Sequence, residues 1–169
     1  MIISISGTPG TGKHTIAREL AKKLDYRIID SNELLRGKYE VSIKELNAAV
    51  GPELKDNSII VSHMGHFLKS KKVDLFIIIR CDPMRLKKRL EKRGYSKEKV
   101  HDNILFEALD GSYIESASIH KNTIQVDNTK NIERTIKELV GYITKKRQIK
   151  KFRSNYIKQL IKIENMNRQ

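Results

Sequence analysis

The chain has little of several residue types. Its 169 residues include no tryptophan, one cysteine, three prolines and ten aromatic side chains. A single cysteine, Cys81, excludes a disulfide framework and a cysteine-rich zinc site. The longest apolar run, residues 75–79, is too short to span a membrane, and the first run, residues 2–5, has no basic leader. We therefore expect a cytoplasmic protein without a membrane partner.

Charge, in contrast, is abundant and unevenly distributed. The chain has 34 basic and 20 acidic residues, which gives a formal net charge of +14. Residues 71–99 carry a net charge of +7 and residues 145–169 carry +8, so the rest of the chain is close to neutral. Two separate basic segments therefore need an explanation. The length supports one independently folding core without disulfides or metals.

Short apolar runs alternate with segments of helical periodicity, which is typical of an α/β domain with a parallel sheet. We expect five strands, at residues 2–6, 26–29, 58–62, 75–79 and 123–126, and flanking helices at 13–24, 83–93 and 97–116. One face of the third helix is apolar, with Val100, Ile104, Leu105 and Ala108. A long helix from Asn131 onward places its apolar residues toward the core: Ile132, Ile136, Leu139, Val140 and Ile143.

A glycine-rich loop at residues 7–15 follows the first expected strand and opens the first expected helix. Its glycines let backbone N–H groups curl around phosphate oxygens, and the helix N-terminus adds positive potential. Lys13 is then placed to bridge the β- and γ-phosphates of ATP. This order of elements predicts a P-loop NTPase fold, whose ATP-binding residues are Gly10, Gly12, Lys13, His14 and Thr15.

The position after Lys13 departs from the common pattern, in which a serine or threonine ligates Mg²⁺, because His14 stands there and Thr15 follows. The loop resembles that of adenylate kinases, which also place a residue without a hydroxyl after the lysine. The resemblance implies that the nucleotide and water hold most of the Mg²⁺ shell and that Thr15 contacts phosphate. His14 is either a metal ligand or a solvated residue at the helix start.

The segment after the second strand, residues 30–36, resembles the part of nucleoside-monophosphate kinases where a short helix presents an arginine to the acceptor phosphate. Arg36 suits this task because a guanidinium can hold a phosphate with two hydrogen bonds, in line for attack. The alternative for Arg36 is an exposed helical arginine. We expect a monophosphate-binding region at about residues 30–51, with Asp30 and Arg36 as its acceptor-binding residues.

Two histidines, His63 and His66, follow the third strand, at the edge where parallel sheets bind ligands. This strand end resembles the adenylate kinase isoenzyme 6 family, whose acid-x-histidine motif places its histidine at His63. The acid of that motif corresponds to Val61 and is missing here, and Asp30 is a candidate replacement. His63 either relays a proton in ATP hydrolysis or is a buried structural histidine. His66 is interpreted as structural.

Three arginines, Arg85, Arg89 and Arg93, recur every four residues and so share one helix face. Arginines that close over a transferring phosphoryl group stabilise its negative charge. The resemblance places a short lid at about residues 92–102, with Arg93 on the nucleotide and Arg89 beside it, whereas Arg85 is interpreted as solvated. A solvated basic face is the alternative for all three. Lys130 either matches an ATP-contacting lysine of the family or is an exposed loop residue.

The last 25 residues are both basic and amphipathic, with Ile149, Phe152, Tyr156, Leu160 and Ile163 at helical spacing. We divide the chain into a nucleotide kinase domain, residues 1–145, and a C-terminal extension, residues 146–169. Three interpretations of the extension stay open: a helix docked on its own domain, an RNA- or ribosome-binding arm, and a membrane-surface helix.

The resemblance implies a nucleoside-monophosphate kinase that uses Mg²⁺ and converts ATP and AMP into two ADP, with ATPase activity. It also implies a role in 16S rRNA processing and small ribosomal subunit maturation. The partners would be AMP or another nucleoside monophosphate, rRNA, and the eleventh small-subunit ribosomal protein, on the platform. The alternative is a ribosome-assembly ATPase whose hydrolysis cycle switches binding to the pre-ribosome, with little true nucleotide kinase activity.

Overall fold

The computed structural model describes residues 1–38, 40–69, 71–145 and 156–167. One sheet of five parallel strands runs through the molecule, in the order β2-β3-β1-β4-β5. The strands are β1 (Ile2–Ser6), β2 (Arg27–Asp30), β3 (Ser58–Val61), β4 (Leu75–Arg80) and β5 (Thr123–Asp127). All five expected strands are present, and each begins and ends within one residue of the expected position. The expected α/β class is therefore confirmed.

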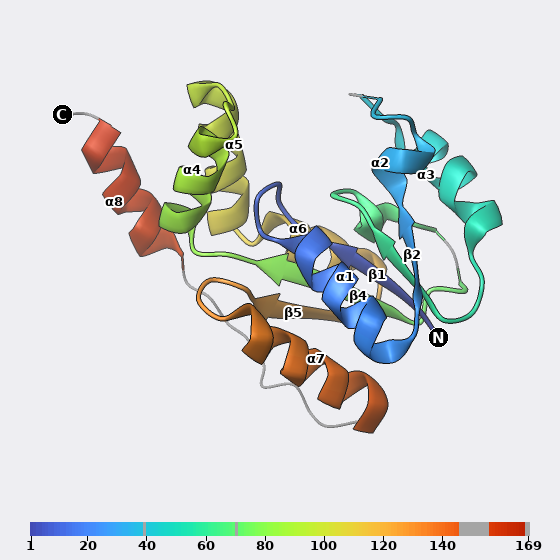
Figure 1. Ribbon diagram of the computed structural model, residues 1–169. Helices are drawn as coiled ribbons and strands as arrows, with labels where there is room; N and C mark the ends of the chain where they lie inside the picture. The colour runs from blue at the N-terminus through green and yellow to red at the C-terminus, as the bar shows by residue number, and fades with distance from the viewer. Residues whose placement is uncertain (39, 70, 146–155, 168–169) are drawn as a thin grey trace.

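Helices cover both faces of this sheet (Figure 1). They are α1 (Lys13–Leu24), α2 (Ser31–Leu34), α3 (Ile43–Val50), α4 (Pro83–Lys92), α5 (Lys97–Ala108), α6 (Gly111–Ile119), α7 (Ile132–Lys145) and α8 (Ile157–Asn167), with the short 3-10 helices η1 (Gly51–Glu53) and η2 (Gly65–Phe67). Because both faces are covered, the central strands are almost continuously apolar, as β4 with six buried positions illustrates. None of the helices in the described ranges is long and apolar enough to cross a membrane.

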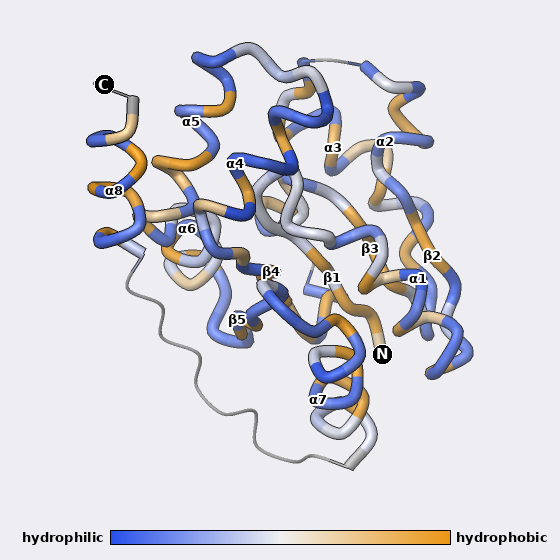
Figure 2. Tube along the Cα trace, turned by 60° about the vertical axis from the view of Figure 1, so that its left-hand side comes forward, coloured by the Kyte–Doolittle hydropathy of each residue, from blue (hydrophilic) through white to orange (hydrophobic). Residues whose placement is uncertain are grey.

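The main core lies between the sheet and the helices α1 and α7. Alternate strand residues such as Ile3 and Ile5 pack there against Ile16 and Leu20 of α1 and Leu139 of α7. Figure 2 shows the hydrophobic residues concentrated along β1. The expected apolar face of α7 is confirmed, since Leu139 belongs to this core, three other members pack against it, and the fifth, Ile136, is buried.

The opposite face of the sheet packs against α3 and α6. Leu46 and Val50 of α3 join a second apolar cluster that includes Ile60 and Phe76 of the strands. The imidazole of His120, just after α6, stacks on the Phe76 ring with the ring centroids 3.6 Å apart. The sheet is thus enclosed, and only its edges and strand ends remain for ligands.

The prediction of a single helix over residues 97–116 is wrong, because α5 and α6 are separate helices. Asp110 between them adopts a left-handed backbone conformation, with φ of 58°, which a continuous helix cannot contain. The apolar face of α5 also differs from expectation. Leu105 is 37% exposed, whereas Glu107 is buried at 1% exposure.

The C-terminal helix α8 lies beside α4 and α5 (Figure 1). Its buried residue Ile163 joins a third apolar cluster with residues of α4 and α5: Leu86, Leu90, Val100 and Ile104. Of the three interpretations of the extension, the structure shows the docked helix for residues 156–167. Ile149 and Phe152, also expected on the apolar face, lie outside the described residues.

We predict that Ile163→Ala destabilises the protein by about 2–5 kcal/mol, because it removes a fully buried side chain from a packed cluster. Ile161→Ala on the same helix is the matched control. Its side chain is 54% exposed, so we expect a change within about 0.5 kcal/mol. Urea unfolding followed by circular dichroism measures both. Equal stabilities of the two variants would contradict the docking of α8.

Candidate functional site

The loop between β1 and α1 has a backbone that requires glycine. Gly12 has φ of 96°, and a Cβ added to it would collide with the side-chain amide of Asn128. A Cβ at Gly10, whose φ is 89°, would lie 2.9 Å from a methyl group of Leu86. The Asn128 amide donates a hydrogen bond to the carbonyl of Thr11, with N···O 2.9 Å, so β5 helps to hold the loop.

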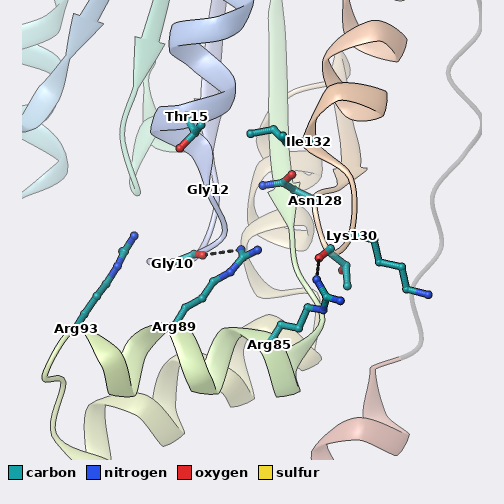
Figure 3. A pocket seen from close by; sticks show the side chains of 10 residues that line it. Gly10, Gly12, Thr15, Arg85, Arg89, Arg93, Asn128, Lys130 and Ile132 are labelled. Carbon is teal, nitrogen blue, oxygen red and sulfur yellow. Dashed lines mark hydrogen bonds between the residues drawn. The ribbon is translucent and has the colours of Figure 1, made fainter.

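A pocket of about 450 Å³ opens beside this loop (Figure 3). Its walls come from three parts of the chain: the loop and the start of α1, the arginine face of α4, and the segment after β5. The lining residues are Gly10, Gly12, Thr15, Arg85, Arg89, Arg93, Asn128, Thr129, Lys130 and Ile132. Four of these ten residues are cationic, which suits a polyanionic ligand.

The arginines of α4 are held in place by hydrogen bonds to the pocket wall. Arg89 Nη1 donates to the carbonyl of Gly10 at 3.1 Å, and it also lies 3.4 Å from the Cys81 sulfur. Arg85, expected to be only solvated, also belongs to the pocket, and its Nη1 donates to the carbonyl of Thr129 at 2.6 Å. Figure 3 shows Arg89 and Arg93 extending toward the loop and Arg85 extending toward the segment after β5.

Lys13 lies at the base of this cationic region and is only 6% exposed. Burial and repulsion from Arg93 lower the pKa of Lys13 to about 8, and the carboxylates of Asp30 and Glu107 partly oppose this shift. The ammonium group is therefore poorly compensated by the protein itself. A phosphate placed at the loop would supply the missing negative charge.

His14 and Asp30 form a pair next to Lys13, with His14 Nε2 3.2 Å from Asp30 Oδ2. The other carboxylate oxygen of Asp30 accepts from the backbone N–H of Asn32 at 2.9 Å and caps α2. Burial, followed by repulsion from Lys13, lowers the pKa of His14, so its ring is neutral at pH 7. Asp30 is also aligned with Val61 in the β2–β3 register, and it brings a carboxylate beside the position where the expected acid is missing.

The two histidines after β3 have different surroundings. His66 is buried, with Nδ1 2.8 Å from the hydroxyl of Ser6 and Nε2 2.9 Å from a carboxylate oxygen of Glu115. These contacts agree with a structural histidine. His63 is exposed at the strand end and close enough to Lys13 to feel its charge. Partial desolvation, followed by repulsion from Lys13 and His66, lowers the pKa of His63.

The two remaining expected residues lie apart from each other. Lys130 lines the pocket in the segment after β5. Arg36 lies in the turn after α2, where it is exposed and has a left-handed backbone with φ of 51°. The structure thus brings together Lys13, His14, Asp30, His63 and Arg93 around the loop, whereas Arg36 stands outside this group.

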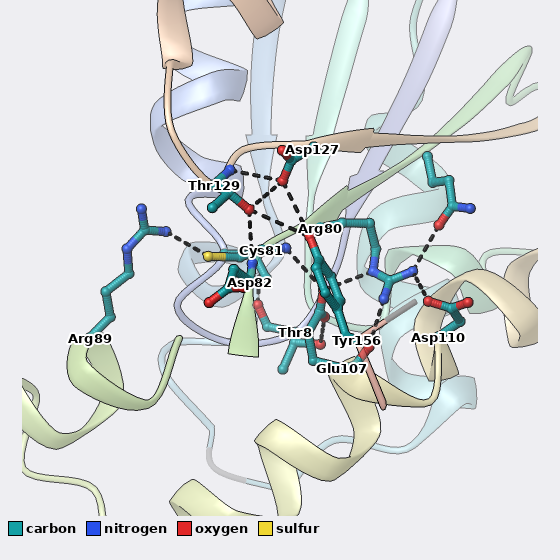
Figure 4. Close-up of polar contacts among 12 residues, drawn as sticks. Thr8, Arg80, Cys81, Asp82, Arg89, Glu107, Asp110, Asp127, Thr129 and Tyr156 are labelled. Carbon is teal, nitrogen blue, oxygen red and sulfur yellow. Dashed lines mark hydrogen bonds and ion pairs between the residues drawn. The ribbon is translucent and has the colours of Figure 1, made fainter. Parts of the chain in front are cut away.

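A buried ion pair behind the loop was not expected from the sequence (Figure 4). Arg80 Nε lies 2.7 Å from Glu107 Oε1, and both side chains are 1% exposed. Glu107 Oε2 accepts a hydrogen bond from the hydroxyl of Thr8 in the loop at 2.5 Å. The available signal was the spacing of Val100, Ile104 and Glu107, which puts a carboxylate on the apolar face of α5.

Among the described residues, no group of three or more His, Cys, Asp and Glu side chains is arranged to hold a metal ion. The donors near the loop are the hydroxyl of Thr15 and the carboxylate of Asp30, whose charge acts on the ammonium group of Lys13. This chemistry fits a divalent cation that enters with a nucleotide, as part of the substrate, better than a resident metal centre.

Comparisons with known proteins agree with this geometry. A family model described as an AAA domain matches residues 3–110. The chain is 39% identical over 154 residues to a Pyrococcus abyssi protein named "Putative adenylate kinase". The matched region covers 85% of this chain and 84% of the relative. Relatives of the same name from Thermococcus kodakarensis and Methanosarcina barkeri are 34% and 32% identical, over 85% of this chain and 85% and 87% of theirs.

Solved structures show the same fold at low sequence identity. Shikimate kinase from Bacteroides thetaiotaomicron superposes with a TM-score of 0.62 at 16% identity, covering 85% of this chain and 98% of that one. Shikimate kinase from Acinetobacter baumannii gives 0.63 at 16% identity, covering 88% and 95%. The expected P-loop fold is therefore confirmed.

The lowered pKa of Lys13 leads to a prediction about proton uptake. At pH 8 roughly half of the Lys13 side chains are neutral, because the pKa is about 8. Bound triphosphate would favour the charged form, so MgATP binding at this pH takes up a fraction of a proton. Calorimetric titration in two buffers of different ionisation enthalpy measures this uptake.

The sign follows from the direction of the shift: affinity for MgATP falls as the pH rises through about 8, since binding must then protonate Lys13. At pH 6.5 the lysine is already charged and its uptake disappears. Lys13→Arg is the control, because a guanidinium stays charged throughout. Equal heats in both buffers at pH 8 would contradict the assignment.

Proposed function

The chain belongs to the adenylate kinase family represented by its Pyrococcus abyssi relative, and within this family we propose that it transfers the γ-phosphoryl group of ATP to AMP, giving two ADP. The observation that carries the proposal is the cationic pocket between the glycine-rich loop and the arginine face of α4. Its 450 Å³ falls in the size range of nucleotide and drug-sized ligands. The AMP acceptor and the transfer itself are the proposed steps.

In this proposal MgATP binds with its phosphates at the loop. Gly10 and Gly12 allow close approach of the backbone, and Lys13 contacts the β- and γ-phosphates. Thr15, in the first turn of α1, contacts phosphate at the helix N-terminus. Mg²⁺ arrives with ATP, and its remaining positions are filled by water that Asp30 orients. Lys130 contacts the nucleotide from the segment after β5.

The hairpin of α4 and α5 acts as the lid, with its tip at residues 92–102. Arg93 sits at the end of α4 and extends toward the loop (Figure 3). There its guanidinium stabilises the negative charge on the phosphoryl group as the bond to ADP breaks and the bond to the acceptor forms. Arg89 holds the loop through the carbonyl of Gly10 and assists from the next turn.

The acceptor binds in the monophosphate region, residues 30–51, on the other side of the loop. Arg36 lies one short helix beyond Asp30 and is exposed, so its guanidinium is accessible to a phosphate entering from solvent. A dianionic AMP phosphate needs no deprotonation before it attacks the γ-phosphorus. Catalysis of this transfer therefore rests on positioning and charge.

The first test measures ADP formation from MgATP with and without AMP. We expect AMP to stimulate turnover, and Arg36→Ala to raise the KM for AMP by about tenfold or more, since it removes a charged hydrogen-bond donor pair. Arg134→Ala on α7 is the control, because that side chain pairs with Glu138 at the exposed surface. The kinase proposal would be contradicted if AMP did not raise the rate of ADP formation and Arg36→Ala did not change it.

Hydrolysis of ATP makes a different demand, because attacking water must lose a proton. His63 is neutral at pH 7, since its pKa is lowered, and it can accept that proton. We predict that His63→Gln reduces ATPase activity without AMP by about tenfold or more and leaves AMP-dependent ADP formation within about twofold. In the wild type, hydrolysis should weaken at acid pH, where His63 becomes protonated, and its lowered pKa moves this loss below the ordinary range of histidine. Equal losses of both activities would assign His63 to ATP binding instead.

A second candidate is a ribosome-assembly ATPase whose hydrolysis switches its binding to a pre-ribosomal particle. The observation in its favour is the net charge of +8 over residues 145–169, which suits rRNA. The proposed partners are rRNA and the eleventh small-subunit ribosomal protein, in the cytoplasm, during 16S rRNA processing. An enzyme that AMP does not stimulate, but that hydrolyses ATP through His63, would favour this candidate over the kinase.

A further inference from the structure

Tyr156 links the C-terminal extension to the nucleotide pocket. It lies beyond residues 3–110, which the family model matches, yet its side chain is buried at 7% exposure. Its hydroxyl lies 3.4 Å from Asp127 Oδ1 and 3.5 Å from the hydroxyl of Thr129 (Figure 4). Asp127 is the last residue of β5, and Thr129 lies in the segment that follows and lines the pocket.

The ring of Tyr156 is held independently of its hydroxyl. The Arg80 guanidinium lies 5.7 Å from the ring centroid, a distance at which cation–π attraction operates. Burial raises the pKa of Tyr156, so the hydroxyl stays protonated and remains a donor. The side chain thus reaches from the buried Arg80–Glu107 pair to the pocket wall.

The segment it contacts, residues 127–130, is held from two sides. Thr129 accepts a hydrogen bond from Arg85 at its carbonyl and from the backbone N–H of Asp82 at its hydroxyl, with N···O 2.9 Å. Its own N–H donates to Asp127 at 3.0 Å. The hydroxyl of Tyr156 contacts Asp127 and Thr129 as well, so it adds a further contact to the same segment.

The rest of α8 carries this link to the lid hairpin. Ile163 packs among the apolar residues of α4 and α5, and Leu160 packs against the same cluster. His101 Nδ1 on α5 lies 3.3 Å from Glu164 Oε1 on α8. One continuous segment of chain, residues 156–167, therefore touches both the wall of the pocket and the hairpin that closes over it.

We propose that Tyr156 is a positioning residue for the nucleotide pocket, which fixes residues 127–130 through Asp127 and Thr129 against the arginine face of α4. The extension is then part of the ATP site, in addition to any external binding. This proposal rests on the proposed function only in naming ATP as the ligand.

The test compares Tyr156→Phe and Tyr156→Ala with the wild type. Calorimetry with Mg²⁺ and a non-hydrolysable ATP analogue gives the affinity, and steady-state kinetics gives KM for each substrate. We expect analogue binding to weaken by about threefold in Tyr156→Phe, which loses the two long contacts of the hydroxyl with Asp127 and Thr129, and by about tenfold in Tyr156→Ala. KM for AMP and kcat should stay within about twofold. Tyr142→Phe, on α7 in the main core, is the matched control.

Two outcomes would overturn the proposal. One is wild-type affinity for the analogue in both Tyr156 variants. The other is a parallel loss of ATP and AMP binding that follows a lowered melting temperature in Tyr156→Phe, because a general folding defect affects both substrates. Analogue binding needs no turnover, so a wild type that binds MgATP but does not phosphorylate AMP would contradict the kinase proposal alone.

Discussion

The Arg80–Glu107 ion pair lies at the carboxyl end of β4, where the sheet, the α4–α5 hairpin and the glycine-rich loop meet. Burying two charges costs several kcal/mol for each unless hydrogen bonds satisfy them. Here the guanidinium donates to the Glu107 carboxylate and carbonyl, and to Gln125 of β5, and it pairs with Asp110 before α6. Because these groups come from β4, α5, β5 and the turn between α5 and α6, the pair requires all of these segments to be in their native places.

The same ion pair also holds the glycine-rich loop. Glu107 accepts from the Thr8 hydroxyl with one carboxylate oxygen and from the Cys81 backbone N–H with the other, at 2.5 and 3.0 Å. The same carboxylate favours the charged form of Lys13 and opposes the burial that lowers its pKa. One buried side chain on α5 therefore shapes the loop and contributes to its electrostatics. A displacement of α5 would change the conformation of the loop and the pKa of Lys13.

The strands and the loop could be predicted from sequence because their signals are local. A buried parallel strand is a short apolar run, and the glycines and Lys13 of the loop stand next to one another in the chain. The break at Asp110 could not be predicted, since helical periodicity continues across it and only the left-handed backbone of one residue marks it. The spacing of Glu107 with Val100 and Ile104 puts a carboxylate on the apolar face of α5, but its partner Arg80 is 27 residues away, so no local pattern predicts the ion pair.

The position of α8 could not be predicted either, because it too depends on residues far apart in the chain. Helical spacing through Tyr156 and Ile163 predicts an amphipathic helix, but it does not say which surface the apolar face covers. The structure places that face on α4 and α5, while Lys158 and Lys162 are exposed. A helix has two faces, and docking uses only the apolar one. Docking on the domain and contact with RNA are therefore compatible, and any partner that binds the exposed lysines would bind a helix that already packs on α4 and α5.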